Sequence, residues 1–312
     1  MRLNTCLAAL ALGTAISTPG ALAGPRVIAS IVPVHSLVAS IMDGVGEPEL
    51  LLQGLSSEHQ ASYAPRQIEA LGSADVVFMI GHGLELKLDE LSGSEAVNRR
   101  TFVALSDTPG LTKLPIRVGA TFPAHVHDAG EAEDGHADGT AAYDPHLWLD
   151  PENAKLMGAA IAGTLAKADP DHASQYAANA TALSAEIDAL EAALRRDLAD
   201  VRGKPFLVQH DAYQYFERRF GLTAAGSITD FAASEPSAQR LKEVRDIVKA
   251  SGAVCVFREP QFSARAADAV TEDTPARSGV VDGIGSTLVP GKQAYGTLLR
   301  TLAQSLKDCL AG

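Results

Sequence analysis

The stretch "DHASQYAANATALSAEIDALEAALRRDLADV", residues 171–201, reads as a single helix with few residues that would interrupt it. It spans about eight helical turns, whereas a helix inside a compact domain usually has three or four. A second helical pattern precedes it, beginning at Pro151. We therefore expect residues 151–201 to form a helical connector, with the long helix as a stiff link between two lobes.

On both sides of this connector, short apolar runs alternate with helical patterns. Before it, "RVIASIVPVHSLVASIMDGV" (26–45) reads as strand then helix, and "APRQIEALGSADVVFMIG" (64–81) as helix then strand. After it, "KPFLVQHDAYQYFERRFGL" (204–222) and "SAQRLKEVRDIVKASGAVCVFREPQF" (237–262) repeat this plan. Such alternation indicates parallel βαβ units. The predicted fold class is α/β, with two lobes of parallel sheet flanked by helices and joined by a long rigid linker helix.

The N-terminus has the features of a secretory signal peptide. Arg2 supplies positive charge, Leu7 to Ile16 form a short apolar core, and Ala21-Leu22-Ala23 is a small-residue cleavage signal. This core is too short to span a membrane, so we expect residues 1–23 to be removed on export. The expected division of the chain is the signal peptide, an N-terminal lobe at 24–150, the helical connector at 151–201 and a C-terminal lobe at 202–312.

Composition limits the classes of partner. The chain of 312 residues is 46% hydrophobic, which is typical of a globular protein. Its formal net charge is −12 at pH 7. Nucleic acid is therefore not an expected partner, because binding phosphates requires a basic face. An acidic exported protein is compatible with the capture of cations.

Two cysteines remain once Cys6 has left with the signal peptide. Cys255 lies in the apolar run "AVCVF", and Cys309 lies in the last helical pattern of the chain. An exported chain with two cysteines most simply pairs them. The pair would tie the last helix to the second sheet, and the alternative is two buried free thiols.

Three of the nine histidines stand beside strand-like runs. His59 follows "LLLQGL", His146 precedes "LWL", and His210 follows "PFLVQ". Because ligands of open α/β folds bind at the carboxyl ends of strands, three elements could bring these imidazoles together. Neutral imidazole is a favoured ligand of zinc. Their wide spacing leaves open a second interpretation, in which each is a partly buried histidine with one hydrogen bond.

Two acids could complete a coordination shell around such a metal. Glu58 adjoins His59, and Asp282 lies in "VVDGIG", at another expected strand end with glycines that permit a tight loop. Three imidazoles with one carboxylate or water make a tetrahedral set that suits zinc. The helical zinc motif H-E-x-x-H and any C-x-x-C pair are absent from the sequence.

Four segments together resemble the periplasmic zinc-binding proteins of ABC transporters, the ZnuA type. They are "SSEHQASYAPRQIEALGSADVVF" (56–78), "DPHLWLDPENA" (144–154), "FLVQHDAYQYFERRFGL" (206–222) and "VCVFREPQF" (254–262). The resemblance spans the mature chain in the order found in that family. It implies two α/β lobes joined by a long helix, with the metal held in the cleft between them.

The resemblance also implies the site residues. By it, His59, His146 and His210 are the metal ligands, and His210 favours zinc because the manganese branch of the family carries Glu there. The fourth ligand is expected to be Asp282, with Glu58 or water as the alternatives. The zinc branch can also carry a disulfide that matches Cys255 and Cys309.

An acidic loop at residues 124–142 contains three further histidines, His125, His127 and His136. The resemblance suggests an auxiliary zinc site that gathers metal and passes it inward. The other interpretation is a solvated acidic loop with no single conformation.

Two residues near the expected ligands are candidates for orienting them. Asp211 and Tyr213 stand beside His210, and a ligating imidazole usually donates its other N–H to such a partner. A further acid, Glu259, follows a strand in "FREPQF" and could reach the cleft or pair with an arginine.

The expected function is the capture of Zn²⁺ in the periplasm and its delivery to the permease of an ABC transporter. We expect a monomer, no enzymatic activity, and a periplasmic zinc chaperone as a further candidate partner. One alternative is a manganese or iron carrier of the same fold. Another is a zinc-dependent hydrolase, since three histidines with an open fourth position are also a catalytic pattern.

Overall fold

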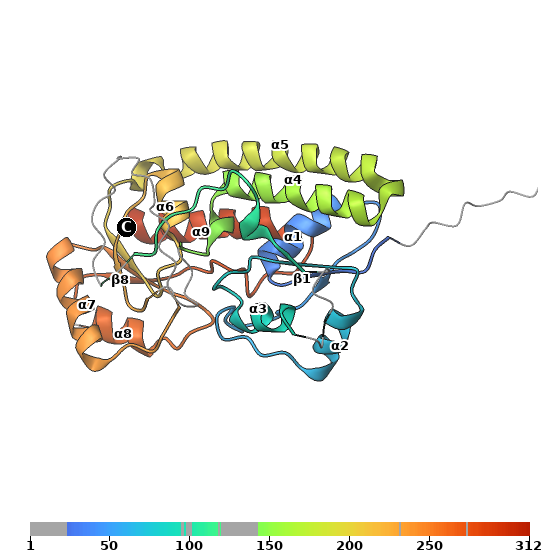
Figure 1. Ribbon diagram of the computed structural model, residues 1–312. Helices are drawn as coiled ribbons and strands as arrows, with labels where there is room; N and C mark the ends of the chain where they lie inside the picture. The colour runs from blue at the N-terminus through green and yellow to red at the C-terminus, as the bar shows by residue number, and fades with distance from the viewer. Residues whose placement is uncertain are drawn as a thin grey trace, which may run out of the picture.

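The structure is a computed structural model that describes residues 24–94, 97, 102–117, 119, 143–230, 232–272 and 274–312. The expected signal peptide at 1–23 and the loop at 124–142, with its three histidines, lie outside the described residues. Two lobes of parallel sheet flanked by helices lie side by side in Figure 1. The predicted fold class is therefore confirmed.

The first lobe is built around a parallel sheet in the strand order β2-β1-β3-β4. Its central strands are buried on both faces, which explains why they read as continuous apolar runs. The strands are β1 Val27–Ala29, β2 Glu49–Leu50, β3 Val76–Met79 and β4 Phe102–Ala104, and the helices are α1 Val32–Ile41, α2 Pro65–Ser73 and α3 Leu86–Ser92.

The second lobe has the equivalent strand order, β6-β5-β7-β8. In each lobe the chain therefore places its second strand on one side of the first, and then its third and fourth on the other. The strands are β5 Phe206–Val208, β6 Ala224–Ser227, β7 Cys255–Arg258 and β8 Arg277–Val280, and the helices are α6 Gln214–Phe220, α7 Ala238–Ser251, α8 Arg265–Thr271 and α9 Ala294–Ala311.

Two packed helices link the lobes. α4 (Pro151–Ala168) begins at Pro151, and the Asp150 carboxylate caps it by accepting a hydrogen bond from the backbone N–H of Glu152 at 3.0 Å. α5 (Ala173–Asp197) runs along both lobes in Figure 1 and packs on α4, α1 and α9. Because α5 is packed on several sides, it is expected to be a rigid link between the lobes.

A single cluster of buried apolar side chains continues from the first lobe through the linking helices into the second. It includes Phe78 of β3, Ile187 of α5 and Phe257 of β7. A shared core of this kind favours small adjustments between the lobes over a wide hinge motion. Within the described residues, no helix is both long enough and apolar enough to cross a bilayer.

The segment "LWL" was expected to be strand-like, and this prediction is wrong. Leu147–Leu149 form a single 3₁₀ turn, and all three side chains are buried. The Asp150 cap and Pro151 start α4 immediately afterwards, so no residues remain to extend and pair with a sheet.

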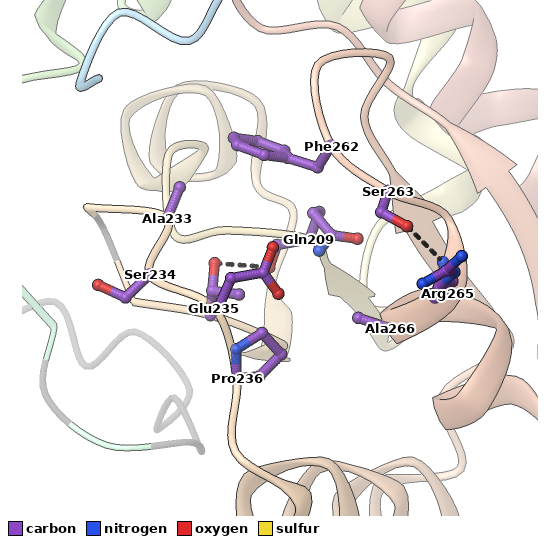
Figure 2. Close-up of a pocket in the computed structure, with 10 residues that line it drawn as sticks. Gln209, Ala233, Ser234, Glu235, Pro236, Phe262, Ser263, Arg265 and Ala266 are labelled. Carbon is purple, nitrogen blue, oxygen red and sulfur yellow. Dashed lines mark hydrogen bonds between the residues drawn. The ribbon is translucent and has the colours of Figure 1, made fainter.

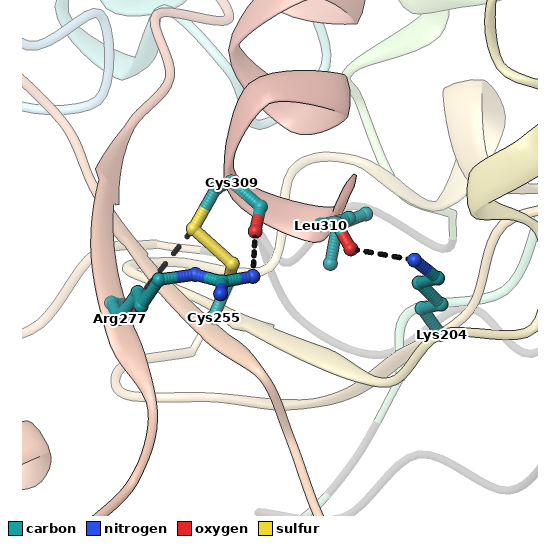
Figure 3. Close-up of a disulfide and its surroundings, with 5 residues drawn as sticks. All are labelled: Lys204, Cys255, Arg277, Cys309 and Leu310. Atoms are coloured by element: carbon teal, nitrogen blue, oxygen red, sulfur yellow. Dashed lines mark hydrogen bonds between the residues drawn. A yellow bond between two sulfur atoms is a disulfide. The ribbon is translucent and has the colours of Figure 1, made fainter. Parts of the chain in front are cut away.

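The disulfide predicted between Cys255 and Cys309 is confirmed, and it joins β7 to α9 (Figure 3). The two Cα atoms lie 6.2 Å apart. Hydrogen bonds reinforce this connection: Lys204 Nζ donates to the Leu310 carbonyl at 2.9 Å, and the Arg277 guanidinium donates to the Cys309 carbonyl. The last helix is therefore tied to the second sheet.

Candidate metal centre

Four buried side chains from distant parts of the sequence converge between the lobes. They are Glu58, His59, His146 and His210, and one donor atom of each lies within 4.8 Å of the others. None of the four residues is more than 7% exposed. Such a group of three imidazoles and a carboxylate is a candidate metal centre.

Glu58 and His59 come from the loop between β2 and α2. The side-chain amide of Gln67 in α2 donates to the Leu51 carbonyl at 2.7 Å and so holds the two ends of this loop together. Glu58 Oε1 lies 3.9 Å from Nε2 of His59 and 3.9 Å from Nε2 of His146. The carboxylate therefore faces the space between these two imidazoles.

His146 is oriented by an acid two residues earlier. The Asp144 Oδ1 atom accepts hydrogen bonds from the His146 backbone N–H at 2.9 Å and from His146 Nδ1 at 2.7 Å. Because a carboxylate oxygen accepts here, Nδ1 carries the proton and Nε2 presents its lone pair to the cluster. The Gln214 amide in turn donates to Asp144 Oδ2 at 2.6 Å.

His210 is oriented by an acid from the neighbouring strand. It follows β5, and its Nδ1 donates to Glu259 Oε1, which follows β7, at 2.7 Å. The two strands are hydrogen-bonded neighbours, and the chain reverses its direction of strand addition between them. In open α/β sheets this is the point where ligands bind.

The spacing of two donor nitrogens matches tetrahedral zinc. Nε2 of His146 and Nε2 of His210 lie 3.3 Å apart. With zinc–nitrogen bonds of about 2.0–2.1 Å, two tetrahedral ligand atoms are separated by roughly 3.3–3.4 Å. The longer distances to Glu58 mean that its carboxylate must move inward by about half an ångström to complete such a shell.

Two polar atoms at the centre have no hydrogen-bond partner among the described residues. They are Nε2 of His59 and Oε2 of Glu58, both fully buried. Buried polar atoms normally find a partner, and where the protein supplies none, an ion or a water molecule takes that place. The donor set therefore fits a bound cation.

The protein environment shifts the protonation of the cluster. Burial lowers the pKa of His59 and His146 well below the usual value, and the neighbouring imidazole of His210 lowers them further. Burial also acts to lower the pKa of His210, but the carboxylates of Glu259, Glu58 and Asp211, with Glu259 the largest, together outweigh it and raise the pKa of His210 to about 9. Burial raises the pKa of Glu58 to about 7.

The sequence motif around His146 also fixes the segment that carries it. Trp148 Nε1 donates to the Gly283 carbonyl at 2.8 Å, and the Tyr215 hydroxyl donates to the Asp144 carbonyl at 2.7 Å. Arg219 pairs with Asp150 at 2.7 Å. His146 therefore sits in a segment that is fastened to the second lobe, although it precedes the linking helices in sequence.

Asp282, the expected fourth ligand, does not join the cluster. Its carboxylate accepts hydrogen bonds from the Gly285 backbone N–H at 2.8 Å and the Ser286 hydroxyl at 3.0 Å. The Asp282 carboxylate is therefore hydrogen-bonded within its own loop, the loop that follows β8. Of the fourth ligands considered, the structure places Glu58 beside the three histidines.

The partner of His210 is Glu259, the further acid at an expected strand end, and not a neighbour of His210 in sequence. Of the two candidates for orienting the ligands, Asp211 receives hydrogen bonds from Arg117 Nε, at 2.9 and 3.0 Å. The Tyr213 ring centre is 6.3 Å from that of His210. Asp144 was not among the candidates, although the "DPH" spacing could have indicated it.

A family model and curated relatives of similar sequence name the same family. The family model described as zinc-uptake complex component A, periplasmic (ZnuA), matches residues 27–309. The chain is 44% identical over 313 residues to the high-affinity zinc uptake system protein ZnuA of Brucella suis biovar 1, covering 93% of each chain. It is 36% identical over 324 residues to the protein of that name from Paracoccus denitrificans, covering 99% of each.

Solved structures show the same architecture. A crystal structure of ZnuA superposes with a TM-score of 0.75 at 26% identity, covering 92% of this chain and 99% of that chain. A zinc-bound ZnuA deletion mutant gives a TM-score of 0.73 at 26% identity, covering 92% and 98%.

Proposed function

The chain belongs to the ZnuA family of periplasmic zinc-uptake components, and on that premise we propose that it captures Zn²⁺ and delivers it to the permease of an ABC importer. The observation that carries this proposal is the convergence of Glu58, His59, His146 and His210 on one buried point. We propose that these four side chains are the ligands of the transported ion, with Glu58 in the fourth position.

Each ligand has a defined task in capture. The three imidazoles bind zinc through nitrogen lone pairs, and the Glu58 carboxylate offsets part of the ion's charge. Asp144 and Glu259 hold His146 and His210 in the tautomer that presents Nε2. Three nitrogens and one oxygen suit zinc better than manganese, which prefers oxygen ligands.

Release follows from how the ligands are divided between the lobes. Glu58 and His59 belong to the loop after β2, whereas His146 and His210 are held by contacts with α6 and β7. A small separation of the lobes would move Glu58 and His59 away from His146 and His210, so that each lobe would keep two of the four ligands. Docking on a permease that favours the separated state would therefore lower the affinity and free the ion.

The same proposal covers location, partners and chemistry. Export directed by residues 1–23 would place the chain in the periplasm, where the family works. The loop histidines His125, His127 and His136 would gather zinc for the main centre, and a zinc chaperone would be a further partner of the monomer. We propose no catalytic role, because Glu58 stands where a hydrolase would need an exchangeable water.

A zinc titration against a competing chelator tests this proposal. His210→Ala should lower the zinc affinity by at least about a hundredfold, since a ligand should matter more than an outer partner, which is typically worth ten- to hundredfold. The control is His82→Asn: His82 is exposed, it adopts the left-handed conformation that Asn tolerates, and it is not part of the cluster. Equal affinity for His210→Ala and the unaltered protein would refute the ligand assignment.

A further inference from the structure

Three aromatic side chains of the described residues pack on the ligand imidazoles, and they differ in exposure. Trp148 lies against His146, with 5.4 Å between the ring centres. Tyr213 and Phe262 both lie against His210, at 6.3 and 5.5 Å. Trp148 and Tyr213 are at most 3% exposed, whereas Phe262 is half-buried. Among these three rings, Phe262 is therefore the one that stands between a ligand and solvent.

The turn that carries Phe262 also carries the hydrogen-bond partner of His210. Residues 259–262, "EPQF", form a β-turn in which Phe262 N donates to the Glu259 carbonyl at 3.2 Å. Pro260 takes the second position of the turn, which proline favours. The Glu259 carboxylate accepts from His210 Nδ1 at 2.7 Å. Because the turn is closed through its backbone, the Phe262 ring can rotate about its side-chain bonds while Glu259 keeps its bond to His210.

A cavity of about 170 Å³ in the C-terminal lobe adjoins this ring (Figure 2). Phe262 forms part of the lining, and in Figure 2 Gln209 lies between Phe262 and Ala266, which also lines the cavity. None of the four proposed zinc ligands is part of this lining. A cavity of about 150 Å³ accommodates a benzene molecule. The cavity beside Phe262 therefore has room for a phenyl ring that turns away from His210.

The burial of the metal centre requires that some covering group moves when an ion enters or leaves. All four proposed ligands are buried, so Zn²⁺ cannot reach Nε2 of His210 while every side chain keeps its place. Movement of Trp148 would break its hydrogen bond to the Gly283 carbonyl. Rotation of the Phe262 ring breaks no hydrogen bond, and the ring has a cavity to move into. Phe262 is therefore the covering ring that moves at the lowest cost.

We propose that Phe262 is the gate of the metal centre. This role rests on the zinc-binding function proposed above. When the ring lies against His210, it closes the approach to the centre from the cavity. When the ring is turned into the cavity, it lets the ion pass. Because the ion meets the same barrier in both directions, the gate controls the rates of zinc association and dissociation and leaves their ratio, the affinity, nearly unchanged.

Stopped-flow measurements on the full mature chain test the gate, with Zn²⁺ as the probe. Trp148 is the only tryptophan of the chain and lies against His146, so its fluorescence should report occupancy of the centre. Mixing zinc-free protein with Zn²⁺ gives the association rate, and mixing zinc-loaded protein with excess chelator gives the dissociation rate. Phe262→Ala should raise both rates by about tenfold and change the affinity by less than about threefold, as expected when only a barrier is lowered.

Filling the cavity should have the opposite effect. Ala266 in α8 lines the cavity, so Ala266→Leu would occupy the space that the ring needs. This variant should lower both rates by about tenfold, again with little change in affinity. Two matched controls should leave both rates unchanged. Ala250→Leu adds the same side chain at an exposed position of α7, and Phe102→Ala removes a half-buried ring from the first lobe.

The possible outcomes separate the gate from the zinc-binding function. If the unaltered protein does not bind Zn²⁺, both proposals fail. If it binds Zn²⁺ and Phe262→Ala exchanges the ion at the unaltered rates, the gate is refuted and the zinc centre stands. A rise in the dissociation rate alone, with an equal loss of affinity, would also refute the gate, because the ring would then only support His210. Should Phe262→Ala not fold, the rates of Ala266→Leu decide, since unaltered rates in that variant would refute the gate.

Discussion

The imidazole orientation in the metal centre is set by individual carboxylates. His146 uses Asp144, an acid two residues away that is itself held by Gln214. His210 uses Glu259, which is 49 residues further along the chain. The first partner is encoded locally, whereas the second depends on the pairing of β5 with β7.

Glu58 and Asp282 can be distinguished as the fourth ligand by a matched pair of neutral variants. Glu58→Gln should lower the zinc affinity by roughly ten- to hundredfold, because a charge-assisted contact is worth about 1.5–3 kcal/mol. Asp282→Asn should leave the zinc affinity unchanged and lower the unfolding free energy by less than about 1 kcal/mol, since its carboxylate bonds only its own loop. Chelator competition and thermal unfolding measure the two effects. The opposite pattern would restore Asp282 as the ligand.

From the sequence, Asp282 was the expected fourth ligand beside the three histidines, with Glu58 or water as the alternatives. Both acids stand in short loops next to expected strand ends, and Asp282 has the glycines of a tight turn. In the structure those glycines bring backbone N–H groups onto the Asp282 carboxylate, which satisfies it within its own loop. Glu58 is buried with one oxygen unpartnered among the described residues. The difference in hydrogen bonding between the two carboxylates is visible only in the three-dimensional structure.

At the scale of elements, periodicity predicted which segments form strands and helices but not how the strands pair. The apolar runs at β1, β3, β5 and β7 are buried central strands, as their composition suggests. The order β6-β5-β7-β8 determines that Glu259 reaches His210, and no local pattern encodes that order. The 3₁₀ turn at 147–149 escaped prediction because a three-residue apolar run fits either a strand or a turn.

The disulfide between β7 and α9 should stabilise the fold without affecting the metal centre. The bridge spans 54 residues, which corresponds to about 4 kcal/mol of chain-entropy stabilisation. Cys255 begins β7, whereas Glu259 follows the end of that strand. We expect the double variant Cys255→Ser/Cys309→Ser to lose about 2–5 kcal/mol of unfolding free energy and to keep its zinc affinity.

Denaturant unfolding of the oxidised protein, the reduced protein and the double variant, together with zinc competition, would test this. Reduction should reproduce the stability loss of the variant. A large fall in zinc affinity in the still-folded variant would contradict this prediction. It would show that the disulfide influences the metal centre, although Cys255 lies at the opposite end of β7 from Glu259.

For the whole molecule, the course of the chain between the lobes determines how the ligands are shared. Arg117 pairs with Asp211, and the segment around His146 is bonded to Tyr215 and Gly283. Parts of the sequence that precede the linking helices therefore pack on the second lobe. We propose that the chain divides into an N-terminal lobe at 24–150, a helical connector at 151–201 and a C-terminal lobe at 202–312. The metal centre does not follow this division of the sequence. Glu58 and His59 move with the first lobe, whereas His146 and His210 move with the second.

This shared centre predicts how zinc affinity depends on pH. At pH 7 His59 and His146 are neutral because their pKa values are lowered, whereas His210, with a pKa raised to about 9, carries a proton that zinc must displace. Below pH 7 Glu58, with a pKa of about 7, is protonated as well. Each displaced proton changes the affinity about tenfold per pH unit. Affinity should therefore fall about tenfold per unit from pH 9 to pH 7, and more steeply below pH 7.

Two variants assign the protons to their groups. Glu259→Gln removes the charge that keeps His210 protonated, so it should flatten the profile above pH 7 even as it weakens binding by about ten- to hundredfold. Glu58→Gln should remove the additional steepness below pH 7. Chelator competition across this range, with calorimetry in buffers of different ionisation enthalpy to count released protons, gives both slopes. A profile that is level from pH 9 to pH 7 in the unaltered protein would mean that His210 is already neutral, and that Glu259 orients this ligand without charging it.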